Sequence, residues 1–326
     1  MEEKLLQIQD LRTTFYTREG QVHAVDGVSI EIREGECTGI VGESGCGKSM
    51  TAMSVMGLLK KPGRVDGGSI WFEGRDLTAM TPRERRKILG NRISMIFQEP
   101  MTSLNPVMTV GRQVREALLL HNRQMTRAEA RDRVIQSFEL VGIPDAAKRY
   151  GEYPHQLSGG LRQRVMIAMA MACDPRLLIA DEPTTALDVT IEAQILHLMK
   201  QLQEEKGTAV MMITHNLGVV AQFCTRLYVM YAGKVMESGT VQEIFKHVCH
   251  PYTDGLMRSV PDMKSKERLY NIRGMVPNML RLPRGCRFCP RCQYSMARCF
   301  REEPELYEAA PGHFVRCFLF EKEEGK

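Results

Sequence analysis

The segment GESGCGKS, residues 42–49, constrains the fold of this chain more than any other feature. It fits the pattern G-x-x-x-x-G-K-[ST] and follows the apolar run CTGIV of Cys37–Val41, which predicts a buried strand. A helix is expected after it, from Lys48 to about Leu59. In this setting the glycines let backbone N–H groups curl around phosphates, and the helix N-terminus adds positive potential. The segment therefore predicts a phosphate-binding loop for a nucleotide.

Individual roles follow from the same pattern. Lys48 is expected to reach the β- and γ-phosphates, and Ser49 to bind Mg²⁺. The thiol of Cys46 is expected to point away from the phosphates and to react with small thiol reagents unless MgATP protects it. The nucleotide-binding residues predicted here are Gly42, Glu43, Ser44, Gly45, Cys46, Gly47, Lys48, Ser49 and Met50.

A second apolar run, LLIAD of Leu177–Asp181, ends in two successive carboxylates. Asp181 is predicted to hold the magnesium ion, directly or through water. Glu182 is placed to orient and deprotonate the attacking water. Many strands end in acidic residues, but together with the phosphate-binding loop this pair predicts hydrolysis of the bound nucleotide.

The remaining pattern predicts a parallel α/β sheet. Buried strands are expected at residues 208–214 and 226–231, and helical patterns such as residues 190–206 lie between the strands. Residues 111–142 have a wholly helical pattern, which indicates an inserted helical subdomain at about residues 100–170. We expect a nucleotide-binding domain over residues 1–260 and a separate extension, rich in Arg, Pro and Cys, over residues 261–326.

Composition narrows the functional classes. The chain has 326 residues, of which 43% are hydrophobic and 25% charged, and this length is enough for two or three cores. The net charge of +5 is spread along the chain and gives no strong case for a nucleic-acid partner. No signal peptide and no membrane span are expected, so we expect the ten cysteines to be cytosolic thiols or metal ligands.

The segment LSGGLRQR, residues 157–164, predicts a turn at the start of a helix and therefore a second anion site. A chain with one phosphate-binding loop does not need a second for the same nucleotide, so this turn is expected to face the ATP of another subunit. These residues resemble the signature of the ATP-binding-cassette (ABC) ATPases, and the resemblance covers roughly residues 1–260. The signature residues are Leu157, Ser158, Gly159, Gly160 and Leu161.

The resemblance implies a P-loop NTPase fold with a RecA-like parallel core, an N-terminal antiparallel β part and the helical subdomain. It implies that Gln98, in MIFQEP, senses Mg²⁺ and contacts the transport partner. It also implies that His215, in ITHN, is the switch residue that responds to the γ-phosphate. With Glu182, these two form the expected catalytic set, and Ser49, Gln98 and Asp181 form the expected magnesium set.

Further residues take roles from the same resemblance. Phe15 matches the aromatic side chain that stacks on adenine, with Tyr16 as the alternative. Asn216 stands where relatives usually carry Asp, which removes a negative charge near His215. The loop expected to cross the dimer interface consists of Ala186, Leu187 and Asp188.

Longer stretches resemble the ATPase subunits of dipeptide, oligopeptide and nickel importers. They are QEPMTSLNPVMTVGRQ, YPHQLSGG, DEPTTALDVTIEAQI and HPYTDGL. This resemblance implies a subunit at the cytoplasmic face of the membrane that pairs with a different but related ATPase. Two membrane permease subunits and an extracytoplasmic peptide-binding protein would complete the system. The alternatives are an importer of nickel or another small solute, and a DNA-repair ATPase that uses the arginines near the cysteines (Arg284, Arg287, Arg291, Arg298) on nucleic acid.

The stretch GCRFCPRCQYSMARC, residues 285–299, places four cysteines in fifteen residues. With Cys317, five thiols are candidates for a metal site that typically takes four, and zinc would accept any four of them. The run resembles the C-terminal extension of the dipeptide and oligopeptide branch. That resemblance implies a [4Fe–4S] cluster on Cys286, Cys292, Cys299 and Cys317, with Cys289 as a spare thiol.

Overall fold

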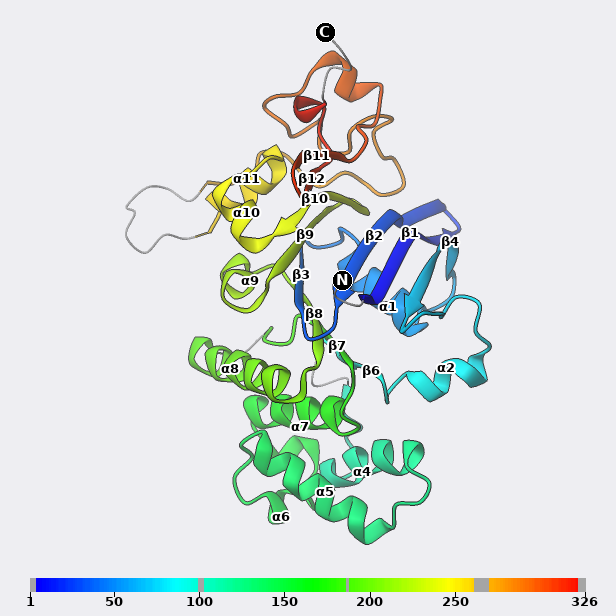
Figure 1. Ribbon diagram of the computed structural model, residues 1–326, viewed down its shortest axis with the longest axis vertical. Helices are drawn as coiled ribbons and strands as arrows, with labels where there is room; N and C mark the ends of the chain where they lie inside the picture. Colours follow the sequence, from blue (N-terminus) through cyan, green and yellow to red (C-terminus); the bar gives the residue numbers. More distant parts are fainter. Residues whose placement is uncertain (1–3, 99–102, 186–187, 261–269, 322–326) are drawn as a thin grey trace. The chain divides into compact units, whose positions relative to one another are not determined.

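The computed structural model describes residues 4–98, 103–185, 188–260 and 270–321 (Figure 1). These residues fall into two compact units. We call residues 33–36 and 79–212 the helical unit, and residues 4–32, 37–78 and 213–321 the β-rich unit.

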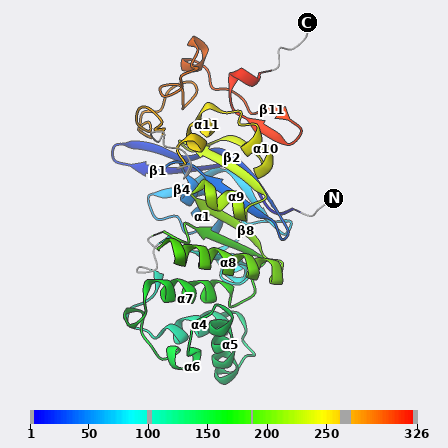
Figure 2. The same cartoon turned by 90° about the vertical axis from the view of Figure 1, so that its left-hand side faces the viewer.

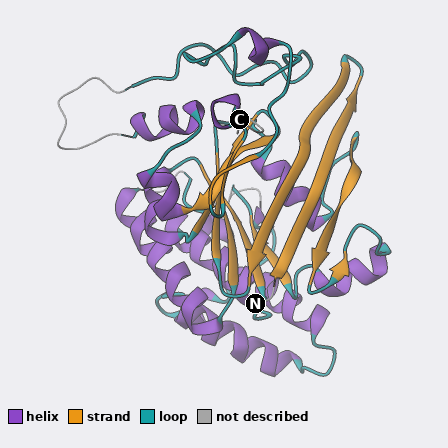
Figure 3. Ribbon diagram, turned by 45° about the horizontal axis from the view of Figure 1, so that its top comes forward, coloured by secondary structure: helices purple, strands orange, loops and turns teal. Residues whose placement is uncertain are grey.

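The β-rich unit contains a four-stranded sheet of order β2-β1-β4-β5. Its strands are β1 (Lys4–Thr17), β2 (Gly20–Arg33), β4 (Gly63–Phe72) and β5 (Arg75–Asp76). Strands β1 and β4 pair antiparallel from Leu6↔Phe72 to Phe15↔Gly63, and Figure 3 shows how long the first strands are. The expected N-terminal antiparallel β part is thereby confirmed.

The same unit also holds β3, which leads into the phosphate-binding loop, and the strands that pair beside it. Strand β3 (Cys37–Val41) pairs parallel with β9 (Arg226–Tyr231), and β9 pairs antiparallel with β10 (Lys234–Thr240). Helix α1 (Lys48–Met56) packs on β1 and β4. The other helices of this unit are α9 (Leu217–Phe223), α10 (Val241–Lys246) and α11 (Pro251–Arg258).

The helical unit combines buried strands with a bundle of helices (Figures 1 and 2). Its strands are β6 (Ile93–Ile96), β7 (Leu177–Asp181) and most of β8 (Ala209–Thr214), and β6 pairs parallel with β7. Its helices are α2 (Pro82–Ile88), α4 (Val110–His121), α5 (Arg127–Leu140), α6 (Ala146–Arg149), α7 (Gly159–Met171) and α8 (Val189–Lys206), with a short 3₁₀ turn, η1 (Pro154–Gln156). Helix α7 packs against α4, α5, α8 and β6, so it lies at the centre of this unit.

Strands β3, β7 and β8 consist entirely of buried residues. Continuous apolar runs are typical of parallel strands covered on both faces, and the predicted strands are confirmed to within one residue of their ends. The predicted helix from Lys48 ends earlier than expected, at Met56, because Gly57 adopts a left-handed φ of 63° and caps it.

The extension after residue 260 adds two strands to the sheet of the β-rich unit. They are β11 (Tyr307–Ala310) and β12 (His313–Val315), and β12 pairs antiparallel with β10. Two 3₁₀ turns, η2 (Ala297–Phe300) and η3 (Phe318–Phe320), lie beside them in sequence. The extension therefore shares a sheet with the strands before it.

A buried carboxylate fastens this junction. Glu237 of β10 is fully buried and accepts hydrogen bonds from His313 Nε2 at 2.8 Å, the Cys249 amide at 2.8 Å and the His250 amide at 2.9 Å. Because a buried charge is costly unless it is hydrogen-bonded, these three donors make the site stable.

His250 caps helix α11 in its neutral form. Its Nδ1 accepts a hydrogen bond from the Tyr252 amide at 3.0 Å, and the residue is only 1% exposed. Burial, opposed by the nearby Glu237 charge, lowers the pKa of His250 to about 4.

We predict that His250 makes folding pH-dependent between its folded pKa of about 4 and the ordinary value of about 6.5. The unfolded chain binds the proton first as the pH falls, so the stability is fully present above 6.5 and is lost toward 4. Between pH 7 and pH 5 the free energy of unfolding should drop by about 2 kcal/mol from this group. Urea unfolding at both pH values measures it.

The variant His250→Asn is the matched control, because an Asn oxygen can keep the cap without titrating. Its stability should change less between pH 7 and pH 5 than that of the wild type, by about the same 2 kcal/mol. Equal pH dependence in the two proteins contradicts the assignment.

Candidate functional site

The phosphate-binding loop runs between β3 and α1 and is packed too closely for side chains at two positions. A Cβ at Gly42 would lie 2.1 Å from the carbonyl oxygen of Met230, and one at Gly47 would lie 2.4 Å from that of Ala24. Both glycines have positive φ, 153° and 107°. The loop is therefore wedged against β2 and the end of β9, and only glycine fits these two positions.

Lys48 begins α1 and is buried, with 5% of its surface exposed. Its ammonium donates to the carbonyl oxygens of Gly42 at 2.7 Å and Glu43 at 3.2 Å. The side chain thus folds back over the loop, where its charge and the backbone amides converge on the space for a polyphosphate.

Cys46 lies under this loop. Its thiol is 1% exposed, and its Sγ lies 3.8 Å from the Lys48 ammonium. Burial raises the pKa of Cys46, although Lys48 acts in the opposite direction. The thiolate is the reactive form, so burial and the raised pKa act against the expected modification by thiol reagents, which stays a prediction.

Phe15 and Tyr16, the two candidates for stacking on adenine, differ in their surroundings. The Tyr16 hydroxyl donates to Asp66 at 2.9 Å, and the guanidinium of Arg64 covers its ring at 4.2 Å from the centroid. Phe15 is half-buried beside Gly63 on the neighbouring strand. Tyr16 already has a stacking partner, which favours Phe15.

In the helical unit the structure brings two predicted catalytic residues together. Glu182 follows the buried Asp181 at the end of β7, and its Oε2 accepts hydrogen bonds from Gln98 Nε2 at 3.0 Å and Thr185 Oγ1 at 2.9 Å. Its φ of 46° lies in the left-handed region, which is rare for a residue with a side chain. Such strained positions gather at functional sites.

The predicted signature residues lie at the start of α7. Leu157 is buried, and the Ser158 hydroxyl accepts from the Leu161 amide at 3.4 Å as the helix N-cap. Gly159 is exposed, and a Cβ there would meet nothing within 4 Å. The first turn of this thirteen-residue helix is therefore open at Gly159.

His215 is exposed in the β-rich unit, directly after β8. The side chain of its neighbour Asn216 accepts from the amides of Gly218 at 2.9 Å and Val219 at 3.4 Å, and so caps α9. Asn and Asp cap helices equally well, which explains why this departure leaves the fold intact. Ala186 and Leu187 lie outside the described residues, and Asp188 stands exposed before α8.

The five cysteines of the extension line one small pocket. They share it with Phe288 and His250, among others. Burial raises the pKa of Cys286 to about 12 and that of Cys289 to about 11, so without a metal these thiols are protonated at neutral pH. The clustered thiols are Cys286, Cys289, Cys292, Cys299 and Cys317.

Sequence reasoning missed what the arginines between these cysteines do. Arg287 pairs with Asp26, and Arg291 pairs with Glu43 of the phosphate-binding loop; the two side chains are only 8% and 4% exposed. The available signal was one arginine between each pair of neighbouring cysteines in CRFCPRC; the segment folds as successive turns, from which both arginines reach acidic residues elsewhere in the β-rich unit.

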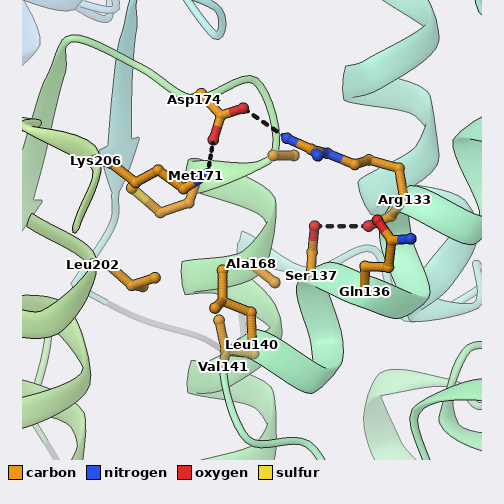
Figure 4. A pocket seen from close by; sticks show the side chains of 11 residues that line it. Arg133, Gln136, Ser137, Leu140, Val141, Ala168, Met171, Asp174, Leu202 and Lys206 are labelled. Atoms are coloured by element: carbon orange, nitrogen blue, oxygen red, sulfur yellow. Dashed lines mark hydrogen bonds and ion pairs between the residues drawn. The ribbon is translucent and has the colours of Figure 1, made fainter.

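A separate cleft of about 190 Å³ lies in the helical unit (Figure 4). Asp174 lines it and forms ion pairs with Arg133 of α5 at 2.7 Å and with Lys206 of α8 at 3.0 Å. None of the predicted nucleotide-binding, signature or metal residues lines it. Asp174 therefore ties α5 to the end of α8.

Comparison with known families and structures agrees with this geometry. A family model described as "ABC transporter" matches residues 25–185, and one described as "Oligopeptide/dipeptide transporter, C-terminal region" matches residues 236–299. Among solved structures, a dimeric post-hydrolysis state of the ATP-binding cassette MJ0796 with ADP and Pi superposes with a TM-score of 0.66 at 30% identity, over 72% of this chain and 98% of that one.

Curated relatives are similar over nearly the whole chain. The oligopeptide transport ATP-binding protein AppD of Bacillus subtilis is 50% identical over 98% of each chain. The dipeptide transport ATP-binding protein DppD of Lactococcus lactis is 48% identical over 98% of this chain and 92% of its own. OppD of Escherichia coli, an oligopeptide transport ATP-binding protein, is 50% identical over 96% and 93%.

The chain therefore belongs to the ABC-type ATPases. Within them it is an ATP-binding, ATP-hydrolysing subunit of the oligopeptide and dipeptide transporters, which confirms the resemblance seen in the sequence. Membrane permease subunits and a peptide-binding protein are the partners that this class implies. No helix in the described part of the chain is long and apolar enough to cross a bilayer.

We predict that Glu182→Gln leaves MgATP binding within a few-fold of wild type and slows hydrolysis by about 10²- to 10⁴-fold. Gln keeps the size and the hydrogen-bonding reach of Glu182 but cannot take a proton from water. Nucleotide affinity and phosphate release, measured on the assembled transporter, check both parts.

Thr185→Ala is the control, because it removes one hydrogen bond to the same carboxylate and leaves the base in place. It should slow hydrolysis by less than about tenfold. Turnover in Glu182→Gln close to that of Thr185→Ala would show that another group is the base.

Proposed function

We propose that this chain powers the import of dipeptides or oligopeptides by a cycle of ATP binding and hydrolysis. In this cycle the loop of residues 42–50 holds the phosphates, Phe15 stacks on adenine, and Ser49, Asp181 and Gln98 serve the magnesium ion. Glu182 activates water, and His215 responds to the γ-phosphate. The observation that carries the proposal is the Glu182 carboxylate, held by Gln98 and Thr185 at a strained turn directly after β7.

The working unit is a head-to-tail pair of ATPases. Each chain carries one phosphate-binding loop and one signature turn, and the signature turn forms a second anion site at the start of α7. Because the first turn of α7 is exposed, this site is free to act on the partner's ATP. The partner is a different but related ATPase. Residues 186–188 contribute the loop between the two subunits. ATP binding closes the pair and hydrolysis reopens it, a two-state switch that membrane subunits can use.

Two permease subunits hold this pair at the cytoplasmic face of the membrane, and an extracytoplasmic protein delivers the peptide. The nucleotide-binding domain is residues 1–260, with its helical subdomain at about 100–170, and residues 261–326 form the extension. Ion pairs of Arg287 and Arg291 within the protein argue against the DNA-repair alternative, since both side chains are largely covered.

The cysteine pocket carries a [4Fe–4S] cluster in this proposal, on Cys286, Cys292, Cys299 and Cys317. When bound, the cluster supplies a covalent cross-link for a segment with little core of its own. The residues present fit such a group, because the four proposed ligands line one pocket and Cys thiolates are the usual ligands of iron–sulfur clusters. Four thiolates are also a donor set for structural zinc, so the metal content decides between the two groups.

Reconstitution tests the transport function. In vesicles with permease subunits and binding protein, ATP hydrolysis should rise several-fold when a peptide is present, as coupling between the two sites requires. DNA added to the purified ATPase, or nickel added in place of the peptide, should have no effect. Stimulation by DNA or nickel with none by peptides would reject the proposal.

Anaerobic purification tests the cluster. The protein should be brown, with about four irons and four labile sulfides per chain. Ala at Cys286, Cys292, Cys299 or Cys317 should remove or destabilise the colour. Cys289→Ala and Cys249→Ala, the latter a cysteine outside the pocket lining, should keep it. One stoichiometric zinc in a colourless protein, or iron loss in Cys289→Ala, contradicts the assignment.

A further inference from the structure

The cysteine-rich segment and the phosphate-binding loop touch. Arg291, between Cys289 and Cys292, forms a bidentate ion pair with Glu43, with Nη1 at 2.6 Å from one carboxylate oxygen and Nη2 at 3.0 Å from the other. Glu43 is the second residue of the loop GESGCGKS. A contact over 248 positions of sequence thus links the extension to the loop that is proposed to bind ATP.

The guanidinium of Arg291 makes all the hydrogen bonds that it can donate. The side chain is 4% exposed, and its guanidinium also donates to the Tyr231 hydroxyl at 3.3 Å and to the carbonyl oxygens of Arg273 at 3.0 Å and Ile272 at 3.3 Å. Together with the two bonds to Glu43, every N–H group of the guanidinium has an acceptor. Such a fork fixes the position of its carboxylate partner, which a Lys ammonium cannot do as well.

Aromatic packing supports the same contact. Phe288 is 2% exposed, and its ring centroid lies 5.3 Å from that of Tyr231 and 5.3 Å from that of Tyr252. The hydroxyl of Tyr252 accepts a hydrogen bond from the Glu43 amide at 2.8 Å. The extension therefore holds Glu43 through its side chain directly and through its backbone by way of Tyr252.

Arg287 acts on the other side of the loop. It donates to Asp26 and to the carbonyl oxygen of Ala232. The next residue, Gly233, donates its amide to the carbonyl oxygen of Cys46 at 2.8 Å. Two arginines from one cysteine-bearing segment thus reach the loop, one directly and one through a turn.

We propose that the cysteine-rich extension braces the phosphate-binding loop, with Arg291 as a positioning residue that fixes Glu43 and neutralises its charge. Without Arg291, an uncompensated carboxylate would stand in the loop that receives the phosphates, and the loop would lose its attachment. Because Arg291 lies between two of the clustered cysteines, ATP affinity depends on the integrity of the cysteine site. The inference rests on the proposed ATP binding by this loop.

The experiment compares Arg291→Gln with Arg298→Gln in the full chain. Arg298 is the matched control, because it belongs to the same segment and its ion pairs with described residues, Glu302 and Glu321, both lie within the extension. Two quantities are measured: the Kd for MgATP, and amide hydrogen exchange of residues 42–48 without nucleotide. Arg291→Gln should weaken MgATP binding by about 5- to 30-fold and speed exchange in the loop, and Arg298→Gln should change Kd less than about twofold.

A double substitution tests the charge argument. Glu43→Gln combined with Arg291→Gln removes the uncompensated carboxylate, so its MgATP affinity should recover part of the loss seen in Arg291→Gln alone. If Arg291→Gln folds poorly by circular dichroism or iron content, Arg291→Lys replaces it, since Lys keeps the charge but loses the fork.

Distinct results separate the proposals. Wild-type exchange and affinity in Arg291→Gln, or in Arg291→Lys where it is used, overturn the brace. An MgATP affinity of the double variant no better than that of Arg291→Gln also overturns it. If the wild-type chain does not bind MgATP, the proposed function fails. The amide hydrogen exchange of residues 42–48, measured without nucleotide, still shows whether Arg291 braces the loop. Faster loop exchange in an iron-free Cys292→Ala chain supports the link to the cysteine site, and unchanged exchange there refutes it.

Discussion

The close approach of the phosphate-binding loop to β2 and β9 is the constraint on which the rest of the structure depends. Gly42 and Gly47 lie against the carbonyl oxygens of Met230 and Ala24 at distances that no Cβ allows. The loop amides can converge on a phosphate only because the backbone is pressed into this shape. The strands behind the loop must therefore be fixed, and the antiparallel β10 and the extension beyond it contribute to fixing them.

The extension makes this support continuous. Strand β12 pairs with β10, and the buried Glu237 joins β10 to His313 and to the turn before α11. Tyr252, at the start of α11, then reaches the amide of Glu43. A chain of packed and hydrogen-bonded groups thus leads from the cysteine-rich segment to the loop, and such chains can carry energetic coupling when their elements have two states.

The residues proposed to act on ATP are divided between the two units. The loop and His215 belong to the β-rich unit, whereas Asp181, Glu182, Gln98 and the signature turn belong to the helical unit. The left-handed turn at Glu182 is held by hydrogen bonds from Gln98 and Thr185, within one unit, so the carboxylate proposed as the base keeps its orientation.

The sequence by itself determined the strands, the helices, the family and the candidate residues for ATP, because each depends on local patterns. Apolar runs fix β3, β7 and β8, and the loop motif has few alternative meanings between a strand and a helix. It did not show that Cys46 is buried, that Arg64 covers Tyr16, or that Arg291 pairs with Glu43. Those facts depend on which surfaces meet after the chain has folded. Residues 43 and 291 are 248 positions apart in the sequence, and they meet only in the folded protein, in which β12 of the extension pairs with β10.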